Sequence, residues 1–295
     1  MVKLLDPKMD FIFKNIFGSE NNKEILISFL NATLKSEDKI KSVFIKNGDI
    51  EKEHLTDKFS RLDIKAITDK NEHINIEIQM KNEYNMIQRT LYYWAKLYEG
   101  QLKEGDNYSK LSRTICINIL NFSYLNNDKF HSAFRLKDIE TNDELTDIQE
   151  IHFIEVPKLK DNSDEKDMLV AWTEFLKDPE SEKVRTLEMS VEEIRKARQE
   201  LVRISNDDRQ RELYNIRKKA MLDESDALYN AEQKGIEKGK LAGLEEGMKV
   251  GEQKGKIEMV KGLLLNNVDI EIIKTTSGLT IDEINNIKKL WFCCK

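Results

Sequence analysis

Two acidic residues and a glutamine lie at spacings that could hold a metal ion. Asp63 falls within residues 61–65, and Glu77 and Gln79 fall within residues 74–80. Carboxylate and amide oxygens are hard ligands of the kind that Mg²⁺ and Mn²⁺ prefer. Two carboxylates that are brought close together repel each other unless a cation lies between them. These residues therefore predict a divalent-metal site, provided that the fold brings the two segments side by side.

The two segments are predicted to be adjacent strands of a β-hairpin. Apolar and polar residues alternate in residues 61–66 and 74–80, which is the period of a half-buried strand, and a polar turn separates them. Alternate residues of a strand point to the same face, so Asp63 shares a face with Lys65, and Glu77 shares one with Gln79. We expect the opposite, buried face to consist of Ile64, Ala66, Ile76 and Ile78.

The surrounding sequence resembles a known family. The Asp, then Glu-x-Gln pattern is similar to the Glu-x-Gln variant of the PD-(D/E)xK nuclease motif. Its neighbours resemble the recombination-promoting nuclease (Rpn) and transposase group of that superfamily. The segments that carry this resemblance are residues 6–18, 26–34, 61–63, 76–79 and 88–94. They follow one another in the family's order and cover residues 1–125 of the chain.

The resemblance implies a fold and an activity. The fold is α/β, with a restriction-endonuclease-like αβββαβ core in which helices flank a mixed sheet, followed by an all-helical C-terminal region. The implied activity is a DNA endonuclease that hydrolyses phosphodiester bonds with Mg²⁺ or Mn²⁺, in association with DNA recombination or mobile elements. The pattern of residues 1–120 agrees with this core, because it predicts two short helices, a strand, the hairpin, a long helix and a buried strand in that order.

The resemblance also implies roles for individual residues. Asp63 and Glu77 would bind the metal, which would polarise the scissile phosphate and activate a water. The third position of the motif is usually a lysine, whereas Gln79 can orient a water but carries no charge. Lys65 could supply the missing positive charge. Without the resemblance, the two carboxylates could simply be acidic residues on the wet face of a hairpin.

Two helices could contribute further residues to the site. Asp10 and Lys14 lie one turn apart on the first helix, where they could complete the site or form a simple ion pair. On the helix after the hairpin, Arg89 could hold a phosphate and Tyr93 could pack beside the nucleic acid. In the alternative, Arg89 is a surface charge and the core of this helix consists of Tyr92, Trp94 and Leu97.

Composition excludes several classes of protein. The net charge of −6 excludes an indiscriminately basic, histone-like protein, although a local basic face or a metal can still offset the repulsion from phosphate. No apolar run approaches the roughly 18 residues that a membrane span needs, and the N-terminus lacks the apolar core of a signal peptide. The three cysteines do not form a disulfide framework. We therefore expect a cytoplasmic protein that makes no contact with a membrane.

The chain is expected to divide into four parts. Residues 1–160 would form the nuclease domain, 161–232 a charged helical region, 233–262 a glycine-repeat helix, and 263–295 a small helix-turn-helix-like segment. The polar stretch 157–165 predicts the first boundary. Capping-box patterns that begin at Ser190 and Thr280 predict the starts of two helices.

The glycine repeat predicts a contact between helices. Glycine recurs every four residues, at Gly235, Gly239, Gly243, Gly247, Gly251 and Gly255. Each costs a helix roughly 1 kcal/mol relative to alanine, and a period of four drifts by about 40° per repeat around a helix of 3.6 residues per turn. The resulting groove would let another helix approach closely, so we expect a homo-oligomer formed through the C-terminal region. The alternatives to an enzyme are a catalytically inactive, oligomeric DNA-binding protein or an adaptor built on the same fold.

Overall fold

The computed structural model describes residues 3–46, 64–164 and 166–292 of the 295-residue chain. The chain divides into two compact units, Met1–Ile216 and Arg217–Lys295. Asp63 lies outside the described residues, so its place beside Glu77 stays a prediction. The finer division expected at residues 160, 232 and 262 likewise stays a prediction.

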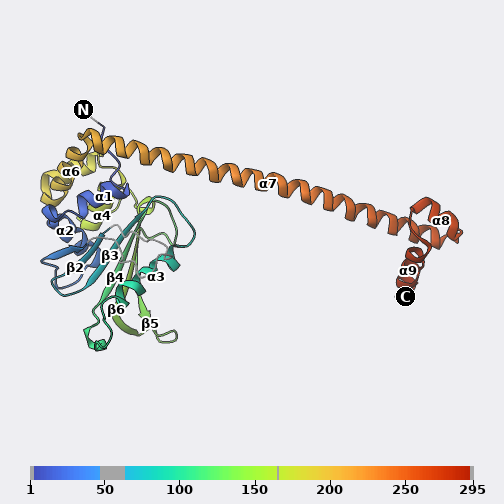
Figure 1. Cartoon of the computed structure of the whole chain (residues 1–295), viewed down its shortest axis with the longest axis horizontal. Helices are drawn as coiled ribbons and strands as arrows, with labels where there is room; N and C mark the ends of the chain where they lie inside the picture. Colours follow the sequence, from blue (N-terminus) through green and yellow to red (C-terminus); the bar gives the residue numbers. More distant parts are fainter. Residues whose placement is uncertain (1–2, 47–63, 165, 293–295) are drawn as a thin grey trace. The chain divides into compact units, whose positions relative to one another are not determined.

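A mixed sheet forms the centre of the first unit (Figure 1). Its described strands are β1 (Val43–Lys46), β2 (Ile64–Thr68), β3 (His73–Gln79), β4 (Thr114–Leu120), β5 (His131–Lys137) and β6 (Glu144–Glu155). They lie in the order β1-β2-β3-β4-β6-β5. The first three pair antiparallel, β3, β4 and β6 run parallel, and β5 returns antiparallel to β6. The mixed α/β fold expected from the sequence is confirmed.

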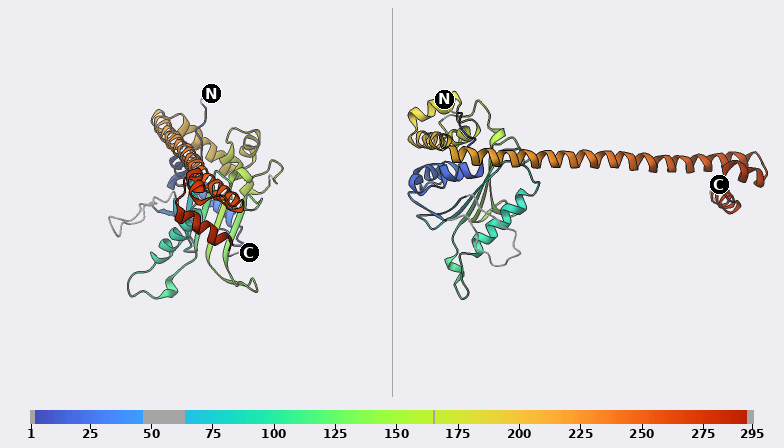
Figure 2. Two further views of the ribbon diagram at one scale, coloured as in Figure 1. Left: turned by 90° about the vertical axis from the view of Figure 1, so that its right-hand side faces the viewer. Right: turned by 45° about the horizontal axis from the view of Figure 1, so that its top comes forward.

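Helices cover both faces of this sheet. The N-terminal helices α1 (Asp10–Phe17) and α2 (Lys23–Leu34) are separated at Gly18–Asn22, as expected from the sequence. They pack with α4 (Met168–Lys177) and α6 (Glu192–Ser205) on one side, while α5 (Glu182–Ser190) packs between α4 and α6. The helix α3 (Met86–Glu99) lies on the other side, against β3 and β4. Figure 2 shows α3 apart from α1 and α2 in two further views.

Aromatic rings fill the core beneath α1, α2 and α4. Trp172 of α4 is fully buried, and its ring centroid lies 5.3 Å from that of Phe17 and 6.5 Å from that of Phe29. The indole N–H donates to the hydroxyl of Ser28 at 3.2 Å. Helices beyond residue 160 therefore share one core with the N-terminal helices, because their apolar faces are buried against α1 and α2.

The core beneath α3 differs in one respect from the expected one. Tyr93 is 6% exposed and packs with Leu97, Cys116 and Phe153, whereas Tyr92 is 45% exposed. The alternative that placed Tyr92 in the core is therefore wrong. The helix is turned so that Tyr93, in register with Met86 and Leu97, faces the sheet.

The second unit consists of helices that are joined by short turns. The helix α7 (Asp208–Leu265) continues from the first unit through all six glycines of the repeat. Near its end, Val260 packs with Ile273 of α8 (Ile270–Ser277) and Ile284 of α9 (Ile281–Phe292). No helix among the described residues combines the length and the apolar character that a membrane crossing requires.

Candidate active site

The register of the sheet places Glu77 on the face that α3 covers. Glu77 lies opposite Asn118 of β4, and Lys65 of β2 lies opposite Asn75 of β3. Residues paired across strands point to the same face, so all four share it. The predicted alternation is confirmed, because the residues on the opposite face are all buried, namely Ile64, Ala66, Ile76 and Ile78.

Glu77 is a buried carboxylate beside a guanidinium. It is only 2% exposed, and Arg89 Nε of α3 lies 3.3 Å from its Oε2. A buried carboxylate is costly unless a cation balances its charge, and Arg89 provides that balance. The same guanidinium lies 3.6 Å from the carboxylate of Glu83 and 5.4 Å from the centroid of the Tyr93 ring. Glu77 therefore does not lie on the wet face of a hairpin.

Hydrogen bonds beneath α3 fix the helix over this carboxylate. The hydroxyl of Thr90 lies 2.9 Å from Oδ1 of Asn118 and 2.7 Å from the carbonyl oxygen of Met86. The amide of Asn118 donates to the carbonyl oxygen of His152 at 3.1 Å. Because Thr90 follows Arg89 directly and Asn118 lies opposite Glu77, these bonds set the position of the guanidinium above the carboxylate.

Two lysines line the open part of the same face. Lys46 of β1 lies opposite Lys65, and the positive charges of both lysines disfavour protonation of His73. Burial, and then the charges of Lys46 and Lys65, lower the pKa of His73 from 6.5 to about 4. Lys65 is a diagonal neighbour of Glu77, which corresponds to a separation of roughly 7–8 Å between the two positions. Lys65 and Lys46 therefore form a cationic strip beside the Glu77 carboxylate.

Sequence reasoning missed Lys46. The strand that the sequence predicts before the hairpin has no predicted partner or register. The signal that could have found it is the period of two, because antiparallel pairing of this strand with the hairpin places one of its polar residues on the face of Lys65.

The other predicted site residues lie in different surroundings. Gln79 ends β3 half-buried, and its carbonyl oxygen accepts the backbone N–H of Asn121 at 2.9 Å. Asp10 and Lys14 are exposed on α1, and Gly18 at the end of this helix lies next to Ile64, on the face of β2 opposite that of Lys65. Tyr93 belongs to the core beneath Arg89, which leaves little of its ring accessible to nucleic acid.

The described part of the site has donors suited to a hard divalent cation. Glu77 and Gln79 contribute carboxylate and amide oxygens from the same face of β3, and oxygen ligands are those that Mg²⁺ and Mn²⁺ prefer. Within residues 3–46, 64–164 and 166–292, no group of three or more histidine, cysteine, aspartate or glutamate side chains could hold a metal ion. A complete ligand set therefore requires a donor from elsewhere in the chain, and Asp63 is the expected one.

The mixed sheet with helices on both faces and the Glu-x-Gln strand at its centre define an α/β protein of the nuclease type. Residues 7–231 match the model of the PD-(D/E)XK nuclease family transposases, and the chain belongs to this family. No curated protein and no solved structure matches it. Nucleases of this family typically use divalent metals and act on DNA. The resemblance seen in residues 1–125 is thus confirmed, and the match extends through α6 into α7.

Proposed function

We propose that the protein is a divalent-metal-dependent DNA endonuclease that hydrolyses phosphodiester bonds, in association with DNA recombination or mobile elements. The observation that carries this proposal is the buried Glu77 carboxylate on the Glu-x-Gln strand, with Lys65 and Lys46 beside it on the same face. A buried acidic residue beside a row of lysines suits a site that receives a cation and a phosphate together.

In this proposal Asp63 and Glu77 hold Mg²⁺ or Mn²⁺. When bound, the cation supplies positive charge at the scissile phosphate and makes a water more acidic. Gln79 orients the attacking water through its amide, and Lys65 stabilises the negative charge that develops on the phosphate. The role of Asp63 rests on the sequence pattern, because this residue lies outside the part of the chain that the structure describes.

Arg89 is a positioning residue in this scheme. Its guanidinium contacts Glu77 and Glu83, so it holds the carboxylate in place and balances its charge before a cation arrives. Lys46 lies further along the strip and would contact the phosphate backbone without touching the reacting atoms. Asp10 and Lys14 lie on the first helix of the family core and are further candidate residues of the proposed site.

The test is nicking of supercoiled plasmid in Mg²⁺, in Mn²⁺ and in EDTA. Glu77→Gln and Asp63→Asn should each lower metal-dependent nicking by about 100-fold or more, the scale of losing a group that stabilises transition-state charge. Glu99→Gln, at the far end of α3, is the control and should cleave like the wild type. DNA binding without cleavage by folded protein would favour the inactive DNA-binding alternative, and wild-type cleavage by both variants would refute the assigned site.

The C-terminal region is proposed to form a homo-oligomer. The side chains of α7 are exposed along most of its length, including Leu241, Leu244 and Met248, each of which is more than half exposed. A helix that leaves large apolar side chains in water has a surface suited to a partner helix. Joining two nuclease domains in this way would allow both strands of a duplex to be cut.

A further inference from the structure

A second, separate site is suggested by a cavity on the opposite face of the sheet. It has a volume of about 340 Å³ and is formed by the segments around Phe130 and Lys160, which lie next to the carboxyl end of β6. His131, in its wall, lies opposite Ile154, whereas the face of Glu77 is continued in β6 by Phe153. Adjacent strand residues point to opposite faces, so this cavity does not belong to the Glu77 site.

Lysines surround this cavity. Lys35, Lys129, Lys158 and Lys160 line it together with only two acidic residues, Asp128 and Asp167, in a chain whose net charge is −6. Lys35 pairs with Asp167 at 2.7 Å, and Lys158 pairs with the buried Glu155 at 2.8 Å. Lys129 and Lys160 form no ion pair with any residue of the described chain. The cavity therefore carries an excess of positive charge that suits an anion.

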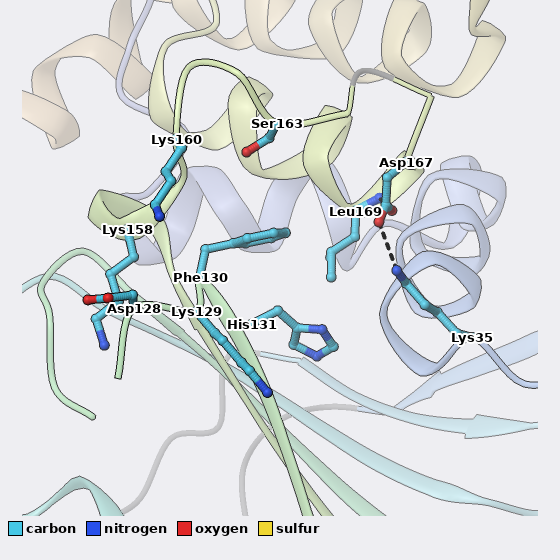
Figure 3. Close-up of a pocket in the computed structure, with 10 residues that line it drawn as sticks. All are labelled: Lys35, Asp128, Lys129, Phe130, His131, Lys158, Lys160, Ser163, Asp167 and Leu169. Carbon is cyan, nitrogen blue, oxygen red and sulfur yellow. Dashed lines mark hydrogen bonds and ion pairs between the residues drawn. The ribbon is translucent and has the colours of Figure 1, made fainter. Parts of the chain in front are cut away.

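The middle of the cavity is aromatic and apolar. Figure 3 shows the rings of Phe130 and His131 between Lys160 on one side and Lys35 on the other, with Leu169 beside them and Lys129 below His131. The centroids of the two rings are 6.4 Å apart. Aromatic faces of this kind stack on nucleic-acid bases, and the volume lies within the roughly 300–1,000 Å³ of small-molecule sites. The cavity thus combines a surface for a planar ring with a cationic rim.

A buried hydrogen-bond chain fixes the ring of His131. Its Nε2 lies 2.9 Å from Nδ1 of His152, whose Nε2 lies 2.6 Å from Oε1 of Glu150. Burial raises the pKa of Glu150, but the hydrogen bonds and charges of His152 and Arg113 outweigh this and hold it at about 2, so Glu150 is an acceptor. This chain of contacts holds the His131 ring in a fixed orientation beside Phe130.

From these features we infer that the cavity binds a nucleoside 5′-monophosphate unit, with its base against Phe130 and His131 and its phosphate at Lys129 and Lys160. The unit is either a free nucleotide or the phosphorylated end of a DNA strand. This site goes beyond the proposed cleavage reaction and requires neither Asp63 nor Glu77.

Calorimetric titration of the full-length protein in EDTA tests the inference without cleavage. The probes are thymidine 5′-monophosphate, thymidine, inorganic phosphate, and a short single-stranded oligonucleotide with either a 5′-phosphate or a 5′-hydroxyl. We expect the nucleotide to bind at least tenfold more tightly than thymidine or phosphate. Lys129→Ala and Lys160→Ala should each raise its Kd about tenfold, the scale of one charge-assisted contact.

Matched variants separate this site from the rest of the protein. Lys137→Ala removes an exposed lysine from the end of β5 and should leave the Kd unchanged. Phe130→Leu should weaken the binding of the nucleotide without changing the binding of inorganic phosphate. Glu77→Gln should bind the nucleotide like the wild type, so a failure of cleavage and a failure of this inference are distinguishable.

The oligonucleotides identify the source of the ligand. Tighter binding of the 5′-phosphorylated strand than of its 5′-hydroxyl form assigns the cavity to a strand end, and binding of the mononucleotide alone assigns it to a free nucleotide. The inference is overturned if no phosphate-bearing probe binds the folded protein. It is also overturned if Lys129→Ala and Lys160→Ala bind as tightly as the wild type, or if phosphate binds as tightly as the nucleotide.

Discussion

Arg89 Nε on α3 lies 3.3 Å from the Oε2 atom of Glu77 on β3, and this contact joins the helix to the strand at the proposed catalytic carboxylate. Glu77 is 2% exposed, while the side chain of Arg89 is 26% exposed and open to solvent on one side. The guanidinium next to this buried carboxylate balances its negative charge. The pair therefore gives the site a defined geometry before substrate binds.

Arg89→Ala should destabilise the fold by about 1–3 kcal/mol, because it removes the guanidinium next to the buried carboxylate. The loss should be smaller than for a fully buried ion pair, because Arg89 is partly exposed to solvent. The loss should be smaller in a Glu77→Gln background, where no buried charge needs balancing. Urea unfolding of the wild type, both single variants and the double variant measures this coupling. Strictly additive losses would contradict it, and Glu83→Gln, at an exposed partner of Arg89, is the control.

Lys46→Ala and Lys65→Ala should each lower the affinity for DNA and make that affinity less dependent on salt concentration. Each contact between a lysine and a phosphate contributes about 0.9 to the slope of log Kd against log salt concentration, so each variant should lower that slope by about one unit. Binding to a duplex in EDTA at several salt concentrations measures this slope. Lys103→Ala, beyond the far end of α3, should bind like the wild type.

Cleavage rates then distinguish the two lysines. Lys65 is the diagonal neighbour of Glu77, so Lys65→Ala should lower kcat as well as DNA affinity, whereas Lys46→Ala should act mainly on affinity. Full cleavage by Lys65→Ala at saturating DNA would remove this lysine from the proposed chemistry.

Periodicity predicted the faces of the central strands because one face is apolar. Ile64 and Ile76 had to be buried, so the alternation of β2 and β3 fixed the direction of Lys65 and Glu77 as well. The contact between Arg89 and Glu77 could not be predicted in the same way. It depends on how α3 is rotated and docked over β3, and this docking involves a hydrogen bond between Thr90 and Asn118, which are 28 residues apart in sequence.

Sequence patterns for helix capping also fail where packing decides the end of a helix. The pattern Thr280-x-x-Glu283 is a capping box, as expected: the Thr280 N–H donates to Glu283 Oε2 at 2.7 Å and the Glu283 N–H donates to Thr280 Oγ1 at 3.3 Å. The similar pattern at Ser190 does not begin a helix, so the prediction of a cap there is wrong. Ser190 ends α5, and the extended Val191 precedes α6. Packing of α5 against α4 and α6 extends that helix through the serine.

Acidification should destabilise the protein through its buried histidines. Burial is the largest cause that lowers the pKa of His73 and of His131 from 6.5 to about 4, with smaller effects from Lys46 and Lys65 on His73 and from His152 and Lys35 on His131. Asp167 and Glu150 act on His131 in the opposite direction. Between pH 6.5 and 4 the unfolded chain binds protons that the folded chain does not, so the free energy of unfolding falls as the pH falls.

The size of this effect should be on the order of 1 kcal/mol for each histidine, because both rings remain partly open to solvent. His131→Gln keeps an amide that can hydrogen-bond to His152, and it should flatten the loss between pH 6.5 and 4. Urea unfolding at intervals of pH measures it, and a variant that follows the wild-type curve would contradict the assignment. Below pH 4.5 a further loss is expected as Glu150 is protonated, down to its folded pKa of about 2.

Replacing glycines of the repeat by alanine should stabilise a single helix but weaken the association of two helices. Apart from the adjacent backbone of α7 itself, a Cβ at any of the six glycines would meet no atom of the described chain within 4 Å. In an isolated chain, Gly243→Ala with Gly247→Ala should therefore stabilise α7, by about 1 kcal/mol for each substitution. If a helix of a second copy lies in the glycine groove, the added methyl groups block its close approach, and self-association should weaken while helicity rises.

Sedimentation equilibrium and circular dichroism measure the two effects on the same samples. Glu245→Ala with Lys249→Ala changes two residues at the same spacing, preserves the net charge, and should leave association unchanged. A wild-type protein that stays monomeric, or a glycine variant that associates as strongly as the wild type, would contradict the proposed interface. Loss of association confined to the glycine variant, together with a more stable helix, cannot arise from local unfolding of α7. It would therefore locate the contact between copies at the groove itself.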